Sequence, residues 1–224
     1  MRYFADVCPD ARVKVNVCVV GMLANNVFIL ENPDNPDSCV LVDPSSNAPF
    51  LLECLAGRTP DAIVATHYHF DHVGAAAAIR EATGSPVLAH RLDADHITGK
   101  AAALPGMRAS APCPVDRLLE GGEELELAGV AWKVIHTPGH TPGGICLFAE
   151  GTETTHPVLI AGDTLFDGNI GRVDFPDGSM ADMRSSLTML RGLPKDTYVL
   201  TGHDSLTTIG QLERTVFSYY LGPR

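Results

Sequence analysis

The chain has 224 residues, of which 45% are hydrophobic and 19% are charged, and its formal net charge at pH 7 is −11. This composition is that of a folded globular protein and excludes a disordered or low-complexity chain. The length suits one α/β domain over residues 1–224, and the negative charge argues against a nucleic-acid partner because phosphate backbones attract basic surfaces.

The chain begins without a basic segment followed by an apolar core, and no later apolar stretch is long enough to cross a membrane. We therefore expect a cytoplasmic protein with no membrane partner. The six cysteines are scattered, form no C-x-x-C pair, and mostly lie in or beside apolar runs. This pattern favours reduced thiols that pack as small hydrophobic side chains. The sequence makes no prediction of the oligomeric state.

The first part of the chain alternates β-rich runs with helical spacing. Three β-rich runs, separated by Asn, Pro and Asp residues, predict an antiparallel meander. Helical spacing, a short buried strand, a strong helix former and another strand follow. The expected strands are 13–20, 27–30, 39–42, 62–65 and 86–89, and the expected helices are 48–57 and 75–83. This alternation predicts a layered α/β fold.

Residues 91–114 are hard to assign from their pattern. A short helix is possible near 92–98, and an Ala-, Gly- and Pro-rich run follows over 100–114. A connection of this length is typical of a lid or binding loop, and a mobile surface excursion fits equally well. His90 and His96 lack the spacing of metal ligands, so we interpret them as structural.

The second part of the chain repeats the outline of the first. The expected strands are 125–127, 130–135, 144–148, 158–161 and 198–201, and the expected helices are 180–191 and 210–220. Two similar halves predict two sheets that pack face to face with helices on their outer sides. The result would be a four-layer α/β sandwich.

Three histidines and an aspartate fall within six residues of the segment 66–74, directly after the predicted strand 62–65. In extended backbone alternate side chains share a face, so His67, His69 and Asp71 can converge, while His72 needs a turn to reach them or a neighbouring point. Imidazole and carboxylate groups together favour Zn²⁺, Fe²⁺ or Mn²⁺. The alternative is a polar loop whose histidines cap the next helix.

Polar residues also follow three other predicted strands. The Pro- and Gly-rich loop 136–144 holds His136 and His140 rigidly, and spacing alone does not choose between them as a ligand. Asp163 follows strand 158–161 and could bridge two cations, or it could simply begin a turn or cap a helix. His203 follows strand 198–201.

Together these motifs resemble the metallo-β-lactamase superfamily over nearly the whole chain. Segments 66–74, 136–143, 162–166 and 170–175 look most like glyoxalase II-like (hydroxyacylglutathione hydrolase-like) enzymes of the short bacterial type. The resemblance implies the αβ/βα sandwich and a site for two divalent metal ions, usually zinc and sometimes iron or manganese. It selects His140 over His136. It implies two ligand sets that share Asp163, namely His67, His69, His140 and Asp163, and Asp71, His72, Asp163 and His203.

The resemblance also implies an activity, the hydrolysis of a small-molecule thioester such as S-D-lactoylglutathione. A metal-bound hydroxide is then the expected nucleophile, and Asp71 is expected to orient it as a catalytic residue. Arg172 is a substrate-binding candidate because a basic residue near this position contacts the thiol carrier in the family, although a structural salt bridge is an equal alternative.

Two departures limit this expectation. Only residues 204–224 follow His203, whereas the longer glyoxalase II enzymes carry a further helical domain, and Asp204-Ser205 stands where those enzymes tend to have Glu-Tyr. His72 and the lack of a ligand cysteine argue against antibiotic hydrolysis. A mononuclear iron persulfide dioxygenase, a lactonase and a non-catalytic metal-binding module stay open as alternatives.

Overall fold

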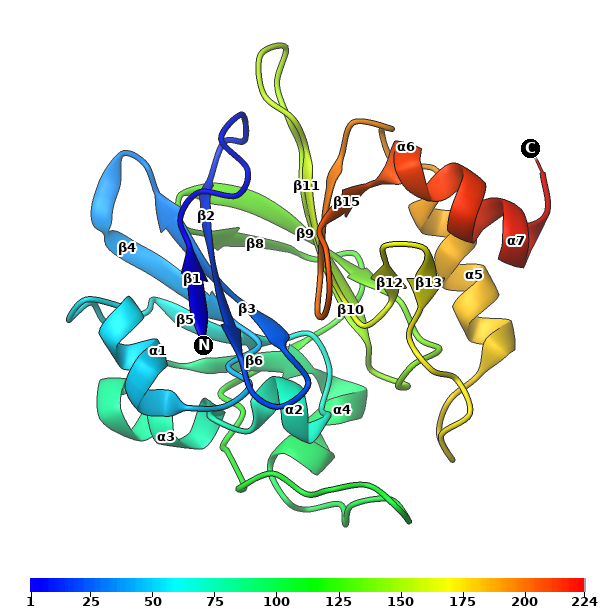
Figure 1. The fold of residues 1–224 in the computed structure, drawn as a ribbon. Coiled ribbons are helices and arrows are strands. Elements are labelled where there is room, and N and C mark those ends of the chain that lie inside the picture. Colours follow the sequence, from blue (N-terminus) through cyan, green and yellow to red (C-terminus); the bar gives the residue numbers. More distant parts are fainter. Residues whose placement is uncertain (224) are drawn as a thin grey trace.

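The computed structural model describes residues 1–223, which form a sandwich of two main β-sheets (Figure 1). The first sheet has seven strands in the order β1-β2-β3-β4-β5-β6-β7. Strands β1 to β4 form an antiparallel meander, which the parallel strands β5 to β7 continue. The strands are β1 Arg2–Phe4, β2 Lys14–Val20, β3 Asn25–Asn32, β4 Asn35–Val42, β5 Ala62–Ala65, β6 Val87–His90 and β7 Arg117–Leu119.

The second sheet has six strands in the order β15-β14-β11-β10-β9-β8. Its neighbours are antiparallel except for β11 and β14, which are parallel. The strands are β8 Glu124–Leu127, β9 Val130–His136, β10 Ile145–Ala149, β11 Val158–Gly162, β14 Tyr198–Thr201 and β15 Thr207–Thr208. A separate two-stranded ribbon, β12 Leu165–Phe166 with β13 Asn169–Ile170, extends from it.

An apolar core fills the space between the sheets, because alternate residues of each facing strand point inward. In β9, Val130, Trp132 and Val134 are buried while the residues between them are exposed. Trp132 is fully buried, and its Nε1–H donates a hydrogen bond to the Leu127 carbonyl at 3.1 Å. One continuous core cluster takes residues from both sheets. The two halves of the chain therefore bury their apolar faces against each other.

Helices cover the outer face of each sheet. Helices α1 and α3 pack with the outer apolar face of the first sheet, and α5, α6 and α7 with that of the second. The helices are α1 Ala48–Cys54, α2 Phe70–Val73, α3 Ala76–Thr83, α4 Arg91–Ile97, α5 Met180–Leu190, α6 Ile209–Leu212 and α7 Ser218–Leu221. The predicted α/β class and four-layer αβ/βα sandwich are confirmed.

The C-terminal region differs from the single helix expected over 210–220. The π-helix Glu213–Phe217 separates α6 from α7. The Ser218 backbone N–H donates to the Glu213 carbonyl, and the Ser218 hydroxyl donates to the same oxygen at 2.6 Å. This i→i+5 bond widens the helix by one residue. The short strands β1, β7 and β15 were not expected either, since two or three residues are too few to show an alternating pattern.

The site is positioned where the two sheets meet. The Ile145 N–H donates to the Thr66 carbonyl at 2.9 Å, and the Asn26 N–H donates to the Gly202 carbonyl at 2.8 Å. These bonds place the ends of β5 and β14 beside the other sheet. The green segment 99–116, which contains no helix or strand, crosses below α2 and α4 in Figure 1. Within residues 1–223, no helix is long and apolar enough to span a bilayer.

Candidate metal centre

Three histidines converge from two loops at this edge of the sandwich. His67 and His69 follow β5, and His69 is the N-cap of α2. His140 lies in the loop between β9 and β10. All three rings are buried, and one ring nitrogen from each lies within 4.8 Å of the others. This spacing can hold one cation between three imidazoles.

Four imidazoles of the site are held on their Nδ1 side by an oxygen of the chain. The contacts are His67 Nδ1 with Thr66 Oγ1 at 3.1 Å, His72 Nδ1 with Asp43 Oδ2 at 2.9 Å, His140 Nδ1 with the Arg172 carbonyl at 2.7 Å, and His203 Nδ1 with the Leu23 carbonyl at 3.0 Å. A ring that donates from Nδ1 presents its Nε2 lone pair on the other side. Such contacts orient metal-ligating histidines in proteins.

The Nε2 atoms of His67, His69 and His140 are buried without a hydrogen-bond partner in the described structure. An unpaired buried polar atom costs about 1–3 kcal/mol, so three together need an explanation. Burial lowers the pKa of His69 to about 3 with the help of neighbouring imidazoles, and it also lowers the pKa of His67 and His140. The rings are therefore neutral at pH 7, which is the form that binds a metal ion.

Asp71, His72 and His203 form a second cluster beside the first. Their ligand atoms also lie within 4.8 Å of one another, with His72 Nε2 3.3 Å from His203 Nε2 and 3.7 Å from Asp71 Oδ2. Burial opposes protonation of the His72 and His203 rings, but the surrounding carboxylates have the larger effect. They raise the pKa of His72, and they raise the pKa of His203 to about 10. The carboxylates of Asp71 and Asp163 beside these two rings create a negative field that a divalent cation would also satisfy.

Asp163 lies between the two clusters at the end of β11. Its Oδ1 is 3.2 Å from His72 Nε2, and its Oδ2 is 3.5 Å from both His140 Nε2 and His203 Nε2. Burial opposes ionisation, but His72 and His203 lower the pKa of this carboxyl well below its ordinary value. A Cβ on Gly202 would lie 2.3 Å from Asp163 Oδ1, so only glycine fits beside the carboxylate. All seven residues predicted as ligands are thus brought together.

A cavity of about 690 Å³ opens beside both clusters. Arg172 lines it, but its guanidinium is paired with Asp174, with Nε 2.9 Å from Oδ1 and the Nη2 atom 2.9 Å from Oδ2. The same guanidinium lies 4.4 Å from the centroid of the Phe175 ring. The salt-bridge alternative therefore describes the Arg172 side chain in this structure, and its contact with substrate stays a prediction.

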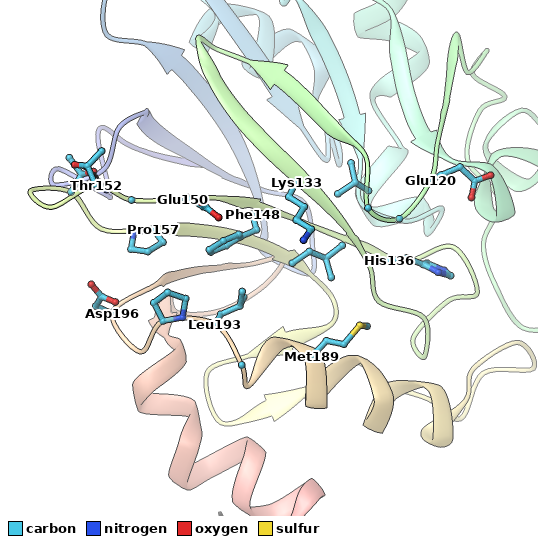
Figure 2. Close-up of a pocket in the computed structure, with 18 of the residues that line it drawn as sticks. Glu120, Lys133, His136, Phe148, Glu150, Thr152, Pro157, Met189, Leu193 and Asp196 are labelled. Carbon is cyan, nitrogen blue, oxygen red and sulfur yellow. Dashed lines mark hydrogen bonds between the residues drawn. The ribbon is translucent and has the colours of Figure 1, made fainter.

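A larger cavity, of about 1160 Å³, lies elsewhere and contains none of the seven predicted ligands. Figure 2 shows Lys133 and Phe148 of the second sheet facing Met189 and Leu193 across this groove. His136 also lines it, where its ring stacks on His90 and its Nε2 lies 2.8 Å from the Pro142 carbonyl. His90, interpreted as structural from its spacing, and His136, set aside as a ligand by the family resemblance, thus both make packing and hydrogen-bond contacts away from the clusters.

The sequence model of the Metallo-beta-lactamase superfamily matches residues 20–203, which include both clusters. The chain belongs to the metallo-β-lactamase superfamily. Its curated relatives include a probable metallo-hydrolase, YqgX, of Bacillus subtilis, which is 33% identical over 85% of this chain and 90% of that protein. A hydroxyacylglutathione hydrolase of a Synechococcus strain is 34% identical over 84% of this chain, but the match covers only 67% of that longer protein.

Two solved structures of the superfamily are similar over nearly their whole length. BLEG-1, described as a B3 metallo-β-lactamase, is 33% identical with a TM-score of 0.78, and the match covers 90% of this chain and 97% of that one. The protein TTHA1623 in a di-iron-bound form is 37% identical with a TM-score of 0.74, and the match covers 89% and 97%. The family model and the relatives therefore identify the chain as a metal-dependent hydrolase, without specifying its substrate.

Sequence reasoning missed three polar residues that support the superfamily site. Asp43 accepts bonds at 2.7 Å from both the backbone N–H and the hydroxyl of Thr66. Asn25 Nδ2 donates to Asp71 Oδ2 at 2.9 Å. Asp93 fixes both histidine loops, because it accepts from the backbone N–H of Tyr68, the Thr141 hydroxyl and the Gly143 N–H. Asn25 and Asp43 could have been signalled by a polar residue at the boundary of an apolar strand, whereas Asp93 lies within α4 and had no such signal.

Proposed function

We propose that the protein is a binuclear metal-dependent thioesterase of the glyoxalase II type, which hydrolyses S-D-lactoylglutathione or a related small acyl thioester. The observation that carries this proposal is the pair of His/Asp clusters joined by Asp163, with three buried Nε2 atoms that have no hydrogen-bond partner in the described chain. The likeness to hydroxyacylglutathione hydrolases supports the choice of a thioester.

His67, His69, His140 and Asp163 would hold one divalent cation, and Asp71, His72, Asp163 and His203 the other. When bound, such ions lower the pKa of water toward 7 and polarise a carbonyl group. Imidazole and carboxylate ligands suit zinc, and also iron or manganese. We propose zinc, although the di-iron form of TTHA1623 makes iron the first alternative to test.

Asp71 is the residue we propose to position the attacking water. Its Oδ2 accepts from Asn25 and lies 3.3 Å from His203 Nε2. Burial opposes ionisation, but the contacts with His203, His72 and Asn25 lower the pKa of Asp71 below its ordinary value. The carboxylate therefore stays ionised at pH 7, and because Asp71 lines the cavity it can accept a hydrogen bond from a water molecule there.

Hydrolysis of a β-lactam is the second candidate, because BLEG-1 is 33% identical and similar over the whole fold. His72 and the lack of a ligand cysteine led us to expect no antibiotic hydrolysis. A β-lactam is therefore tested beside the thioester. Lactone hydrolysis, persulfide oxidation and metal binding without catalysis are the remaining alternatives.

The test is to load the protein with zinc, iron or manganese, count the bound ions by mass spectrometry, and follow thiol release from S-D-lactoylglutathione. A chromogenic cephalosporin, a lactone, and oxygen uptake with glutathione persulfide complete the panel. We expect thiol release that requires two bound ions. No thiol release from the two-metal form would refute S-D-lactoylglutathione as the substrate, and inactivity on every substrate would support the non-catalytic module.

A matched histidine pair provides the control. His140→Gln should remove metal and activity, whereas His136→Gln, four residues earlier at the end of β9, should retain both, because His136 faces the distant groove. Equal losses in the two variants would mean that the loop, and not the ligand, is responsible.

A further inference from the structure

Two arginines, Arg108 and Arg172, line the cavity beside the clusters. Arg172 is neutralised by its bidentate pair with Asp174. Arg108 is different, because no carboxylate lies within the 4 Å ion-pair limit of its guanidinium in the part of the chain that the structure describes. The positive charge at the mouth of the site is therefore uncompensated at Arg108.

The position of Arg108 is set by its neighbours. Met107 packs against the outer core of the first sheet, and its Sδ is 3.6 Å from the hydroxyl of Tyr68, which lies between two predicted ligands. The Arg108 guanidinium carbon is 5.5 Å from the centroid of the Phe70 ring, which adjoins Asp71 in sequence. A guanidinium over a ring is held by a cation–π contact and keeps its N–H edges free. The loop thus presents Arg108 to the cavity as a donor.

Arg108 also stands where two cavities meet. A second cavity, of about 520 Å³, adjoins the first. The two share four lining residues, which are Leu23, Phe70, Asp71 and Arg108. A substrate whose reacting carbonyl lies at the metal clusters in the first cavity would reach the second cavity past this group of residues. Arg108 is within reach of a substituent on the acyl side or on the thiol side of a thioester.

The negative charge around Arg108 bears on whether the site accepts anionic or neutral substrates. The chain carries a net charge of −11, and Asp167 and Asp204 line the same cavity. Away from the proposed metal ions, Asp167 and Asp204 would repel an anionic substituent at this mouth unless a nearby side-chain cation compensates them. A guanidinium binds a carboxylate with two parallel hydrogen bonds, which a neutral amide cannot match.

We propose that Arg108 binds a carboxylate of the substrate and makes the enzyme prefer anionic thioesters over neutral ones. The inference rests on the proposed thioester hydrolysis for its substrate. It assigns a binding role to Arg108 in the segment 91–114, for which the sequence left a lid or a surface excursion open.

The test compares matched thioesters that differ only in a carboxylate or a carboxamide, one pair with the change on the acyl side and one pair with it on the thiol side. With the zinc-loaded enzyme, Arg108→Gln should lower kcat/KM for the carboxylate substrate by roughly tenfold to a hundredfold and leave the carboxamide substrate unchanged. Arg108→Lys should keep part of the preference. Whichever pair loses its preference identifies the side that Arg108 contacts.

Arg184→Gln is the control for removal of one positive charge, because Arg184 is exposed on α5 and lines neither cavity. It should leave both substrates unchanged. An equal loss on carboxylate and carboxamide substrates in Arg108→Gln, or no loss on either, would overturn the assignment.

A binding experiment separates this inference from the proposed function. Non-hydrolysable thioether analogues of the same pairs can be titrated into the zinc-loaded protein by calorimetry, which needs no turnover. If no thioester is cleaved but the carboxylate analogues bind more tightly and lose that advantage in Arg108→Gln, the thioesterase proposal fails and the anion-binding role stands. Equal affinity of the wild type for both analogues would refute the role of Arg108.

Discussion

Asp43→Asn tests whether one buried carboxylate orients ligands of both clusters. Asp43 Oδ2 contacts His72 Nδ1 at 2.9 Å, and also accepts from Thr66 Oγ1, which itself lies 3.1 Å from His67 Nδ1. Asp43 has a left-handed backbone conformation with φ of 53°, which aspartate and asparagine tolerate better than other side chains. Asparagine therefore keeps the backbone and the shape of the side chain while it changes one acceptor into a donor.

The magnitude follows from the three bonds to this carboxylate. Asparagine Oδ1 can still accept from the Thr66 N–H, and the Thr66 hydroxyl can rotate to accept from the new amide. The His72 Nδ1–H then faces the amide NH2 group of the new asparagine and loses its acceptor. The loss of one hydrogen bond to a charged group costs about 1.5–3 kcal/mol. The ring avoids this cost by moving its proton to Nε2, and the metal ion then loses its ligand atom. We expect a metal affinity roughly 10- to 100-fold weaker at the cluster that contains His72.

The assay is competition with a chromophoric chelator, which resolves the two metal affinities, together with thermal unfolding as a check of the fold. Thr66→Val is the matched control, since it removes only the hydroxyl between Asp43 and His67 and should weaken the other cluster instead. A folded Asp43→Asn protein that binds both ions with wild-type affinity would refute the reasoning.

Three further predictions concern the bridge, the core and a buried imidazole. Asp163→Ala should leave a folded protein that no longer retains two metal ions, and an unchanged metal content would refute the bridging role. Trp132→Ala should lower the free energy of unfolding by about 3–5 kcal/mol in urea denaturation, since the side chain is fully buried between the sheets. Burial and the neighbouring His136 lower the pKa of His90 to about 4, so its neutral form stabilises the fold above pH 6.5 and this contribution is lost as the pH falls toward 4. His90 is the N-cap of α4, where its Nδ1 accepts a hydrogen bond from the Leu92 N–H. His90→Asn keeps a capping side chain without this titration, so its unfolding free energy should fall less than that of the wild type over that range.

Much of the fold was predictable because the longer strands show an alternation of apolar and polar residues in the sequence. The alternation of Val130, Trp132 and Val134 follows directly from a strand with one face in the core, and the structure confirms the strand there. The same logic fails for β7, which has three residues, and for the break between α6 and α7, which depends on one carbonyl that accepts from Ser218.

The site was predictable only in part, because local sequence shows which groups are present and not what surrounds them. His67 and His69 are suggested by their alternation after a strand, whereas the contact of Asn25 with Asp71 joins residues 46 positions apart and has no local pattern. A salt bridge of Arg172 was one of the two alternatives, but Asp174, two residues away, was not named as its partner, since spacing does not tell which way a long side chain turns. The roles of all these residues in metal binding stay predictions.

The predicted ligands come from both sheets, at the edge where two backbone hydrogen bonds join them. This arrangement affects how the protein responds to metal ions. His67 and His69 extend from the first sheet, and His140, Asp163 and His203 from the second, so any ion held between them cross-links the two halves of the sandwich. An ion that binds only when both halves are in place stabilises their association, by a free energy that its affinity and its concentration set. Metal supply would then govern not only activity but also the lifetime of the folded chain against thermal opening and proteolysis.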